Sequence, residues 1–380
     1  MATIRKRALP SGKTVWLASY IDGGGGRRFR QFPTKKEADA FLTQARGQVA
    51  AGVHTPDSVS PTVAEAAEMW LKRCERDKLE ATTIRQYRTH VNLHIVPRIG
   101  GTKLSRITAP SVNAFVDLLL ADGRSREMCK RVLVSLSAIV TEAQRRGLVA
   151  VNNVRSATPV KRSKREDTRP EMPTKAELKA IIDATPDRWR PLILTLIFTG
   201  LRGSELRGLL WEDVDLRKGV LMVRRRADRF NNFGPPKSKA GLRDIPLSPI
   251  LLHTLKAWKL ACPISKLGLV FPTGAGGVET HGNILSRVFW PIQVAAGVVT
   301  LKDAQGRALA APDAKFSLHA LRHAAAALWI EQGLSPKRIQ GLMGHASIQQ
   351  TFDQYGYLFE ARDDEAAMMA GVEKGLVEFV

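Results

Sequence analysis

Apolar residues recur at helical spacing along residues 62–154. Three stripes of this kind follow one another, with most members three or four positions apart. They consist of Val63, Ala67, Trp70, Leu71 and Cys74; of Ile84, Tyr87 and Val91; and of Met128, Val132, Leu136, Ile139, Val140 and Ala143. Because this spacing places side chains on one face of an α-helix, it predicts a wholly helical domain with these residues in its core.

A strand pattern precedes the helical one. Residues 14–20 alternate in polarity, a run of glycines follows, and a second alternating run begins over residues 27–32. The alternation predicts two strands joined by a flexible turn. Thr34 and Glu37 then have the spacing of a capped helix start, so a helix should follow through about Arg46.

The last part of the chain mixes both patterns. Thr174 and Glu177 form another cap signal before an apolar helical run. Two short strands are predicted near residues 219–223 and 242–247, with a turn rich in lysine and glycine between them. Further helix starts are predicted at Ser248-Pro249, Ser317 and Ser335-Pro336.

Two polar stretches, at residues 57–61 and 155–169, contain proline and serine and are interpreted as linkers. A chain of 380 residues is too long for one ordinary domain. We therefore expect a multidomain, mainly α protein with a small N-terminal β-sheet-plus-helix module, an all-helical domain, a basic linker and a mainly-α domain with a small antiparallel sheet. The expected boundaries are 1–57, 58–155, 156–171 and 172–380.

The charge balance points to a polyanionic partner. Lysine and arginine total 58 against 36 acidic residues, which gives a net charge of +22 and a pI near 10.3. Double-stranded DNA is the favoured partner, because binding releases the counterions condensed on its phosphates. RNA, an anionic membrane surface and mere solubility are the alternatives. The basic and aromatic N-terminal strands suit a sheet laid in a DNA groove, or a small sheet with a solvated charged face.

Several classes of protein are disfavoured. Cys74, Cys129 and Cys262 are far apart and form no C-x-x-C pair, so neither a disulfide framework nor a zinc knuckle is expected. The basic N-terminus lacks the apolar segment of a secretory leader. The longest apolar run, residues 191–201, is too short to span a membrane. A cytoplasmic protein without a membrane partner is expected.

Four short segments carry residues suited to phosphate chemistry. They are Thr199-Gly-Leu-Arg202-Gly-Ser-Glu205, Pro236-Lys237-Ser-Lys239, His319-Ala-Leu-Arg322-His323, and Gly344-His345 followed ten residues later by Tyr355. Each segment alone is weak evidence of a catalytic site. An Arg–Glu pair is usually a surface pair, and a tyrosine is usually a packing residue. Two histidines one turn apart are a candidate zinc pair, but a third ligand is not evident.

Together the segments supply what metal-free phosphodiester cleavage needs. Two guanidinium groups can hold the non-bridging oxygens, Lys and His can move protons, and Tyr can form a covalent ester. Their order and spacing resemble the Arg…Lys…His-x-x-Arg…His…Tyr constellation of the tyrosine recombinase family. The resemblance covers residues 199–357. Residues 58–155 resemble that family's core-binding domain by length and pattern, and residues 1–57 resemble the arm-binding domain of phage-type integrases.

The resemblance implies a role for each matching residue. Arg202 and Arg322 would hold the scissile phosphate, and Tyr355 would attack to give a 3′-phosphotyrosine. Lys237 would protonate the leaving 5′ oxygen, with Lys239 as the second choice. His319 would assist proton transfer. His345 would hydrogen-bond the phosphate.

The same resemblance implies a site-specific recombinase that integrates or excises a phage or mobile element in a bacterial cell, close to the nucleoid. It would act on core and arm sites as a tetramer on DNA, with accessory bending or excision factors, and without metal, ATP or other cofactor. A type IB topoisomerase, a non-catalytic DNA-binding regulator and a metal-dependent nuclease are the alternatives.

Overall fold

The structure is a computed structural model that describes residues 2–157, 171–302, 306–360, 369 and 373–374. The chain divides into two compact units, residues 1–167 and 168–380, and each is considered by itself. Most of the predicted basic linker, residues 158–170, lies outside the described part. Within the described residues, every helix is too short or too polar to cross a membrane.

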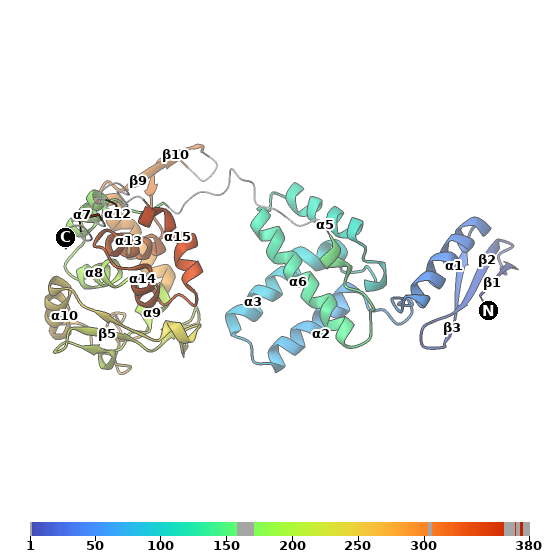
Figure 1. The fold of residues 1–380 in the computed structure, drawn as a ribbon, viewed down its shortest axis with the longest axis horizontal. Helices are drawn as coiled ribbons and strands as arrows, with labels where there is room; N and C mark the ends of the chain where they lie inside the picture. Colours follow the sequence, from blue (N-terminus) through green and yellow to red (C-terminus); the bar gives the residue numbers. More distant parts are fainter. Residues whose placement is uncertain (1, 158–170, 303–305, 361–368, 370–372, 375–380) are drawn as a thin grey trace. The chain divides into compact units, whose positions relative to one another are not determined.

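The chain begins with a three-stranded antiparallel sheet. Its strands are β1 (Thr3–Ala8), β2 (Thr14–Ile21) and β3 (Arg27–Phe32), in the order β1-β2-β3, and α1 (Lys35–Ala50) packs on the sheet (Figure 1). The predictions for β2, β3 and the helix are confirmed, and the Thr34 hydroxyl accepts from the amide of Glu37. The sequence reading missed β1, because four of its six residues are exposed and it carries no apolar alternation.

Residues 62–157 form a helical domain, as predicted. Its helices are α2 (Val63–Arg76), α3 (Ala81–Thr89), the π-helical turn η1 (His90–Ile95), α4 (Val96–Ile99), α5 (Ala109–Ala121) and α6 (Arg126–Arg145), with short 3₁₀ turns at Leu104–Arg106 and Asn153–Ser156. The predicted stripes supply about half of one buried cluster, in which Val132, Leu136 and Ile139 are fully covered. Burial of these side chains drives the packing of α6 against α2.

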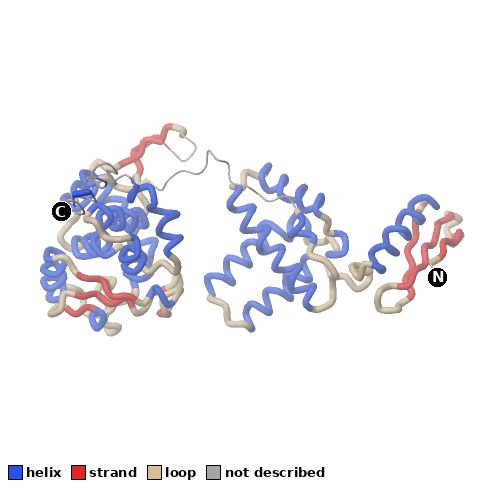
Figure 2. The backbone as a smooth tube through the Cα atoms, in the orientation of Figure 1, coloured by secondary structure: helices blue, strands red, loops and turns tan. Residues whose placement is uncertain are grey.

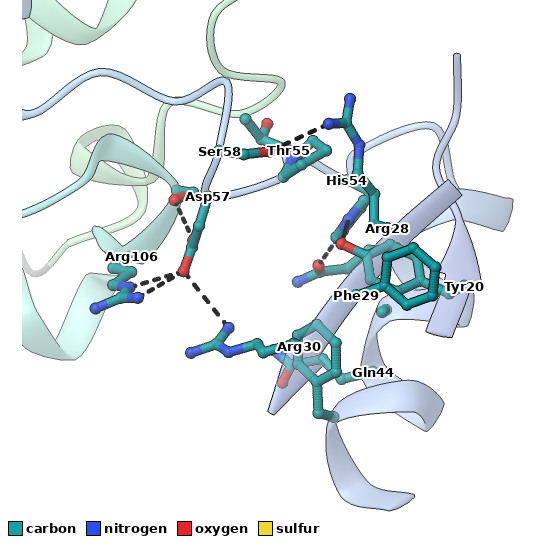
Figure 3. Close-up of a pocket in the computed structure, with 15 residues that line it drawn as sticks. Tyr20, Arg28, Phe29, Arg30, Gln44, His54, Thr55, Asp57, Ser58 and Arg106 are labelled. Carbon is teal, nitrogen blue, oxygen red and sulfur yellow. Dashed lines mark hydrogen bonds and ion pairs between the residues drawn. The ribbon is translucent and has the colours of Figure 1, made fainter. Parts of the chain in front are cut away.

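The polar stretch over residues 57–61 is held by hydrogen bonds and is not a plain tether. Figure 3 shows the Asp57 carboxylate facing two arginines. One oxygen accepts from the Ser105 hydroxyl at 2.6 Å, and the other accepts from Arg106 Nε and Nη2 at 2.9 and 2.7 Å. Arg30 of β3 approaches the same carboxylate at 3.5 Å. Asp57 thus links the sheet module to the helical domain.

The second unit is mainly helical, as predicted (Figure 2). Its helices are α7 (Lys175–Asp183), α8 (Arg190–Thr199), α9 (Gly203–Arg207), α10 (Pro249–Ala261), α11 (His281–Asn283), the π-helical turn η7 (Ile284–Phe289), α12 (Trp290–Ala295), α13 (Leu318–Glu331), α14 (Pro336–Met343) and α15 (Ile348–Glu360). The apolar α8 is buried over most of its length and packs against α10 and α13. This central helix fixes the loop that follows it.

Short antiparallel sheets complete the unit. Their strands are β4 (Val214–Asp215), β5 (Val220–Val223) and β8 (Arg243–Pro246) in one sheet, β6 (Arg226–Ala227) with β7 (Phe233–Gly234) in a second, and β9 (Val299–Lys302) with β10 (Ala308–Ala314) in a third. The two predicted strands are confirmed as β5 and β8, which pair. The connection between them is not the simple turn that was predicted, because β6 and β7 form a hairpin within it. Strands of two residues are too short to leave an alternation signal.

Candidate active site

Arg202 stands at the start of α9, where the chain leaves the buried helix α8. Gly200 ends α8 in the left-handed conformation, with φ of 57°, which favours glycine. The Arg202 backbone amide donates to Glu205 Oε2 at 2.9 Å, and Arg202 Nη1 donates to Oε1 at 2.8 Å. Arg202 Nη2 also donates to the carbonyl of Gly344 at 3.3 Å. About a third of its side chain stays exposed, so the guanidinium can reach a ligand.

Glu205 is buried beneath this arginine and is shared with a second one. Arg243 of β8 donates to it from Nη2 at 2.8 Å and from Nη1 at 3.2 Å. Burial raises the pKa of Glu205, but the hydrogen bond and charge of Arg243, together with Arg202, outweigh it and lower the pKa to about 2. Glu205 is therefore ionised and holds both guanidinium groups in place.

Arg322 lies on α13 and is 2% exposed. Its Nη1 donates to the carbonyl of Gly200 at 2.5 Å, and its Nη2 donates to the carbonyl of Met343. Burial and the nearby charge of Arg202 lower its pKa to about 9, so it remains a cation at neutral pH. These bonds join the loop after α8 to the end of α14, although more than 120 residues separate the arginine from Gly200.

Two histidines lie one turn apart on α13. His319 is exposed and His323 is half-buried, and their rings meet edge to face with centroids 4.8 Å apart. Desolvation by the surrounding protein, then the charges of His323, Arg322 and Arg202, lower the pKa of His319 to about 4. Burial and Arg322 also lower the pKa of His323. Both imidazoles are therefore neutral at pH 7.

His345 follows Gly344, which ends α14 with φ of 64°. A Cβ at this glycine would meet the carbonyl oxygen of Ala240 at 2.9 Å. Ala240 follows Lys239, so the backbone of the segment that carries Lys237 and Lys239, the lysine-bearing segment, packs directly against Gly344. The His345 ring is buried, and its Nδ1 lies 3.0 Å from the hydroxyl of Thr351. Burial and the charge of Arg322 lower its pKa to about 4.

Tyr355 lies on α15 and is completely buried. Its hydroxyl is 2.9 Å from His323 Nδ1, and its ring is nearly parallel to that of His345, with centroids 6.3 Å apart. Burial raises its pKa to about 12, so the phenol is protonated at neutral pH. Tyr357, two residues later, is only partly buried.

Lys237 and Lys239 are exposed on the segment between β7 and β8. Among the described residues, neither lysine hydrogen-bonds with the other residues of the site. The segment itself is anchored, since Arg243 donates to the carbonyls of Gly241 and Leu342 at 3.0 and 2.7 Å. The lysine-bearing segment is thereby tied to the chain that leads into His345.

The structure therefore gathers Arg202, Arg322, His319, His345 and Tyr355 in one region, and ties the segment of Lys237 to it. Sequence reasoning missed two members. Arg243 left no signal of its own, because its role depends on a contact 38 residues away. His323 was noted only as half of a possible zinc pair. Within the described part of the chain, no group of three or more potential ligands gathers to hold a metal.

Residues 172–362, half of the chain, match the model of the phage integrase family, and residues 62–120 match the phage integrase N-terminal SAM-like domain. This chain belongs to the phage integrase family. The integrase is thus a tyrosine-type site-specific DNA recombinase, as the sequence pattern predicted.

Relatives match along nearly the whole integrase. It is 26% identical over 375 residues to prophage integrase IntR of Escherichia coli, covering 93% of this chain and 87% of the relative. It is 25% identical over 368 residues to the ICEBs1 integrase of Bacillus subtilis, covering 90% and 92%.

Solved structures share the integrase's fold. The Tn1549 transposon integrase in complex with a circular intermediate DNA has a TM-score of 0.65 at 20% identity, covering 83% of this chain and 99% of that one. A lambda integrase dimer bound to a COC′ core site has a TM-score of 0.60 at 20% identity, covering 92% and 95%. The predicted multidomain, mainly α architecture is confirmed.

Proposed function

We propose that this integrase cuts and rejoins DNA through a 3′-phosphotyrosine at Tyr355, and thereby integrates or excises a phage or mobile element. The observation that carries the proposal is the meeting of Arg202, Arg322, His345 and Tyr355 around the ends of α8 and α14. Three segments far apart in sequence converge there with the charges that a phosphate requires.

In the proposed reaction, Arg202 and Arg322 bind the non-bridging oxygens of the scissile phosphate, whose negative charge grows in the transition state. His345 adds a hydrogen bond to the same phosphate, and His319 assists proton transfer. The Tyr355 oxygen bonds to phosphorus, and the bond from phosphorus to the 5′ oxygen breaks as Lys237 supplies a proton to that oxygen. The ester keeps the energy of the broken bond, so the 5′ hydroxyl of a partner duplex can attack it and exchange strands without ATP.

Cleavage also requires a movement of α15. Tyr355 has no exposed surface in this structure. The helix must therefore shift locally to present the hydroxyl to a phosphate held by the two arginines. Such gating keeps the nucleophile away from water until DNA is in place.

The rest of the chain is assigned to DNA binding. We propose that residues 1–57 bind arm-type sites, that residues 58–155 bind the core site, and that residues 156–171 connect them to the catalytic domain 172–380. A net charge of +22 supports this assignment. Structural relatives include a lambda integrase tetramer bound to a Holliday junction, which supports action as a tetramer on DNA. Accessory bending or excision factors and a cytoplasmic, nucleoid-associated location complete the proposal.

A suicide DNA substrate tests the proposal directly. The full-length protein should form a covalent adduct in the presence of EDTA, and peptide mass spectrometry should place the DNA on Tyr355. Tyr355→Phe should bind DNA normally and give no adduct, whereas Tyr357→Phe should still give one. DNA linked to Tyr357 would overturn the assignment of the nucleophile, and the absence of any adduct would overturn the mechanism.

A further inference from the structure

His323 contacts the reacting atom of the proposed nucleophile, although the mechanism above gives it no role. Its Nδ1 lies 2.9 Å from the Tyr355 hydroxyl, within ordinary hydrogen-bond distance. The tyrosine is fully buried, and the histidine is half-buried beside it. His323 follows Arg322 directly on α13, so one helix turn presents both a proposed phosphate ligand and a group aimed at the nucleophile.

The direction of this hydrogen bond depends on which nitrogen of His323 carries the proton, and we infer it from the chemistry of the two groups. A phenol is a much stronger acid than a neutral imidazole N–H, so the Tyr355 hydroxyl donates and His323 Nδ1 accepts. The proton of the neutral ring then lies on Nε2. In this tautomer the lone pair of Nδ1 accepts the hydrogen bond from the Tyr355 hydroxyl, and the same lone pair can accept the hydroxyl proton.

The neighbouring histidines are less well placed for this task. His345 lies parallel to the Tyr355 ring at 6.3 Å, and its Nδ1 is engaged with Thr351. His319 makes no hydrogen bond with Tyr355 within the described residues, and it meets His323 edge to face at 4.8 Å. Exposure increases along the row Tyr355, His323, His319, which leads from the buried hydroxyl to the surface.

We propose that His323 is the base that activates Tyr355, and that His319 connects this base to solvent. The proposal rests on the assignment of Tyr355 as the nucleophile. As the Tyr355 oxygen bonds to phosphorus, its proton passes to His323 Nδ1, and the electron pair of the breaking bond leaves with the 5′ oxygen, which takes a proton from Lys237. When a 5′ hydroxyl attacks the ester in the rejoining step, its proton returns to the lysine and His323 returns its proton to Tyr355.

Bound DNA would strengthen this base. The groups that face His323 are Arg322 and His319 on its own helix, with Tyr355 on α15 and His345 after α14. In the absence of DNA, the charge of Arg322 opposes a second positive charge on His323. In the transition state, additional negative charge develops on the phosphate that Arg322 holds, and this charge offsets that of the arginine. His323 therefore gains affinity for a proton when the substrate is in place.

The test compares His323→Asn with the wild type in single-turnover cleavage of a suicide substrate. Asparagine places an acceptor near the position of Nδ1 and can still hold the hydroxyl, but it cannot take a proton. We expect cleavage to slow by about 100-fold or more, with unchanged DNA binding and thermal stability. His253→Asn, at an exposed position on α10, is the matched control and should cleave at the wild-type rate.

Two further measurements separate a base from a structural contact. Added imidazole should partly restore cleavage by His323→Ala. A substrate with a 5′-bridging sulfur, whose leaving group needs no proton, should leave the His323→Asn defect in place while it rescues Lys237→Ala.

A wild-type rate for His323→Asn, or rescue of that variant by the sulfur substrate, would overturn the assignment of His323 as the base. In either case an adduct on Tyr355 would leave the proposed function standing. Failure of the wild type to form an adduct would instead overturn the proposed function.

Discussion

Arg243 and Glu205 form a buried ion pair beneath Arg202, with 2.8 Å between Nη2 and Oε2 and at most 5% of either side chain exposed. Arg243 also ties the lysine-bearing segment to the chain before His345 through the carbonyls of Gly241 and Leu342. One residue outside the catalytic motif thus orients a phosphate ligand and anchors the segment that carries the proposed acid.

Arg243→Met should therefore lower both stability and recombination. The change leaves the buried carboxylate with one partner fewer, which costs on the order of 3 kcal/mol in the free energy of unfolding. Denaturant unfolding and a recombination assay measure the two effects. Arg224→Met is the control, because its ion pair with Asp244 is exposed and should contribute less than about 1 kcal/mol. Equal losses in the two variants would contradict a special role for Arg243.

Charge-preserving changes at the two arginines should abolish strand exchange. Arg202→Lys and Arg322→Lys retain a cation but lose the planar fork that binds two oxygens at once. DNA binding, measured by gel shift, should persist, because most affinity comes from the many other basic side chains. Arg217→Lys, at an exposed position, should recombine normally. Near-normal recombination by either active-site variant would remove the phosphate assignment.

Local patterns predicted the parts of this chain that short-range physics determines. The stripe from Met128 to Ala143 became α6, and the Thr174–Glu177 signal became a complete capping box. Arg202 and Arg322, which the motif grouped, lie close enough for the charge of Arg202 to lower the pKa of Arg322. What the sequence did not reveal depends on contacts between distant segments. The pairing of Arg243 with Glu205, the burial of Tyr355 and its bond to His323 all arise from tertiary packing, which leaves no periodicity to read.

The same limit applies to the N-terminal boundary. Composition marked residues 57–61 as a linker, yet Asp57 contacts Ser105 and Arg106, some 50 residues away. A proline- and serine-containing stretch indicates only that the segment is polar. Whether the segment is held in place depends on partners supplied by the helical domain, and those partners are not apparent from the segment's own sequence.

Removal of the N-terminal module should separate DNA cleavage from regulated integration. A chain that lacks residues 1–53 keeps Thr55 and Asp57, whose bonds to Ala150 and Ser105 support the helical domain. It should fold and cleave core DNA in vitro, but lose integration that depends on a distal arm site. A truncation that removes residues 1–57 should show the same loss and a lower unfolding midpoint. If either chain integrates as well as the full protein, the arm-binding assignment is wrong.

The two lysines before β8 offer a choice that chemistry can decide. Lys237 and Lys239 are both exposed, and their segment packs against Gly344 beside the proposed phosphate site. Only one is needed to protonate the leaving 5′ oxygen, and Lys237 is favoured by the position of the lysine in the family pattern. Lys237→Ala should therefore cleave an ordinary suicide substrate at least about 100-fold more slowly. A substrate with 5′-bridging sulfur should restore its rate, because a thiolate leaves without a proton.

Lys239→Ala, matched in residue type and exposure, should cleave both substrates alike, with any loss confined to DNA affinity. Rescue of Lys239→Ala alone would transfer the role of acid to Lys239, and rescue of neither would show that the leaving oxygen takes its proton from another group.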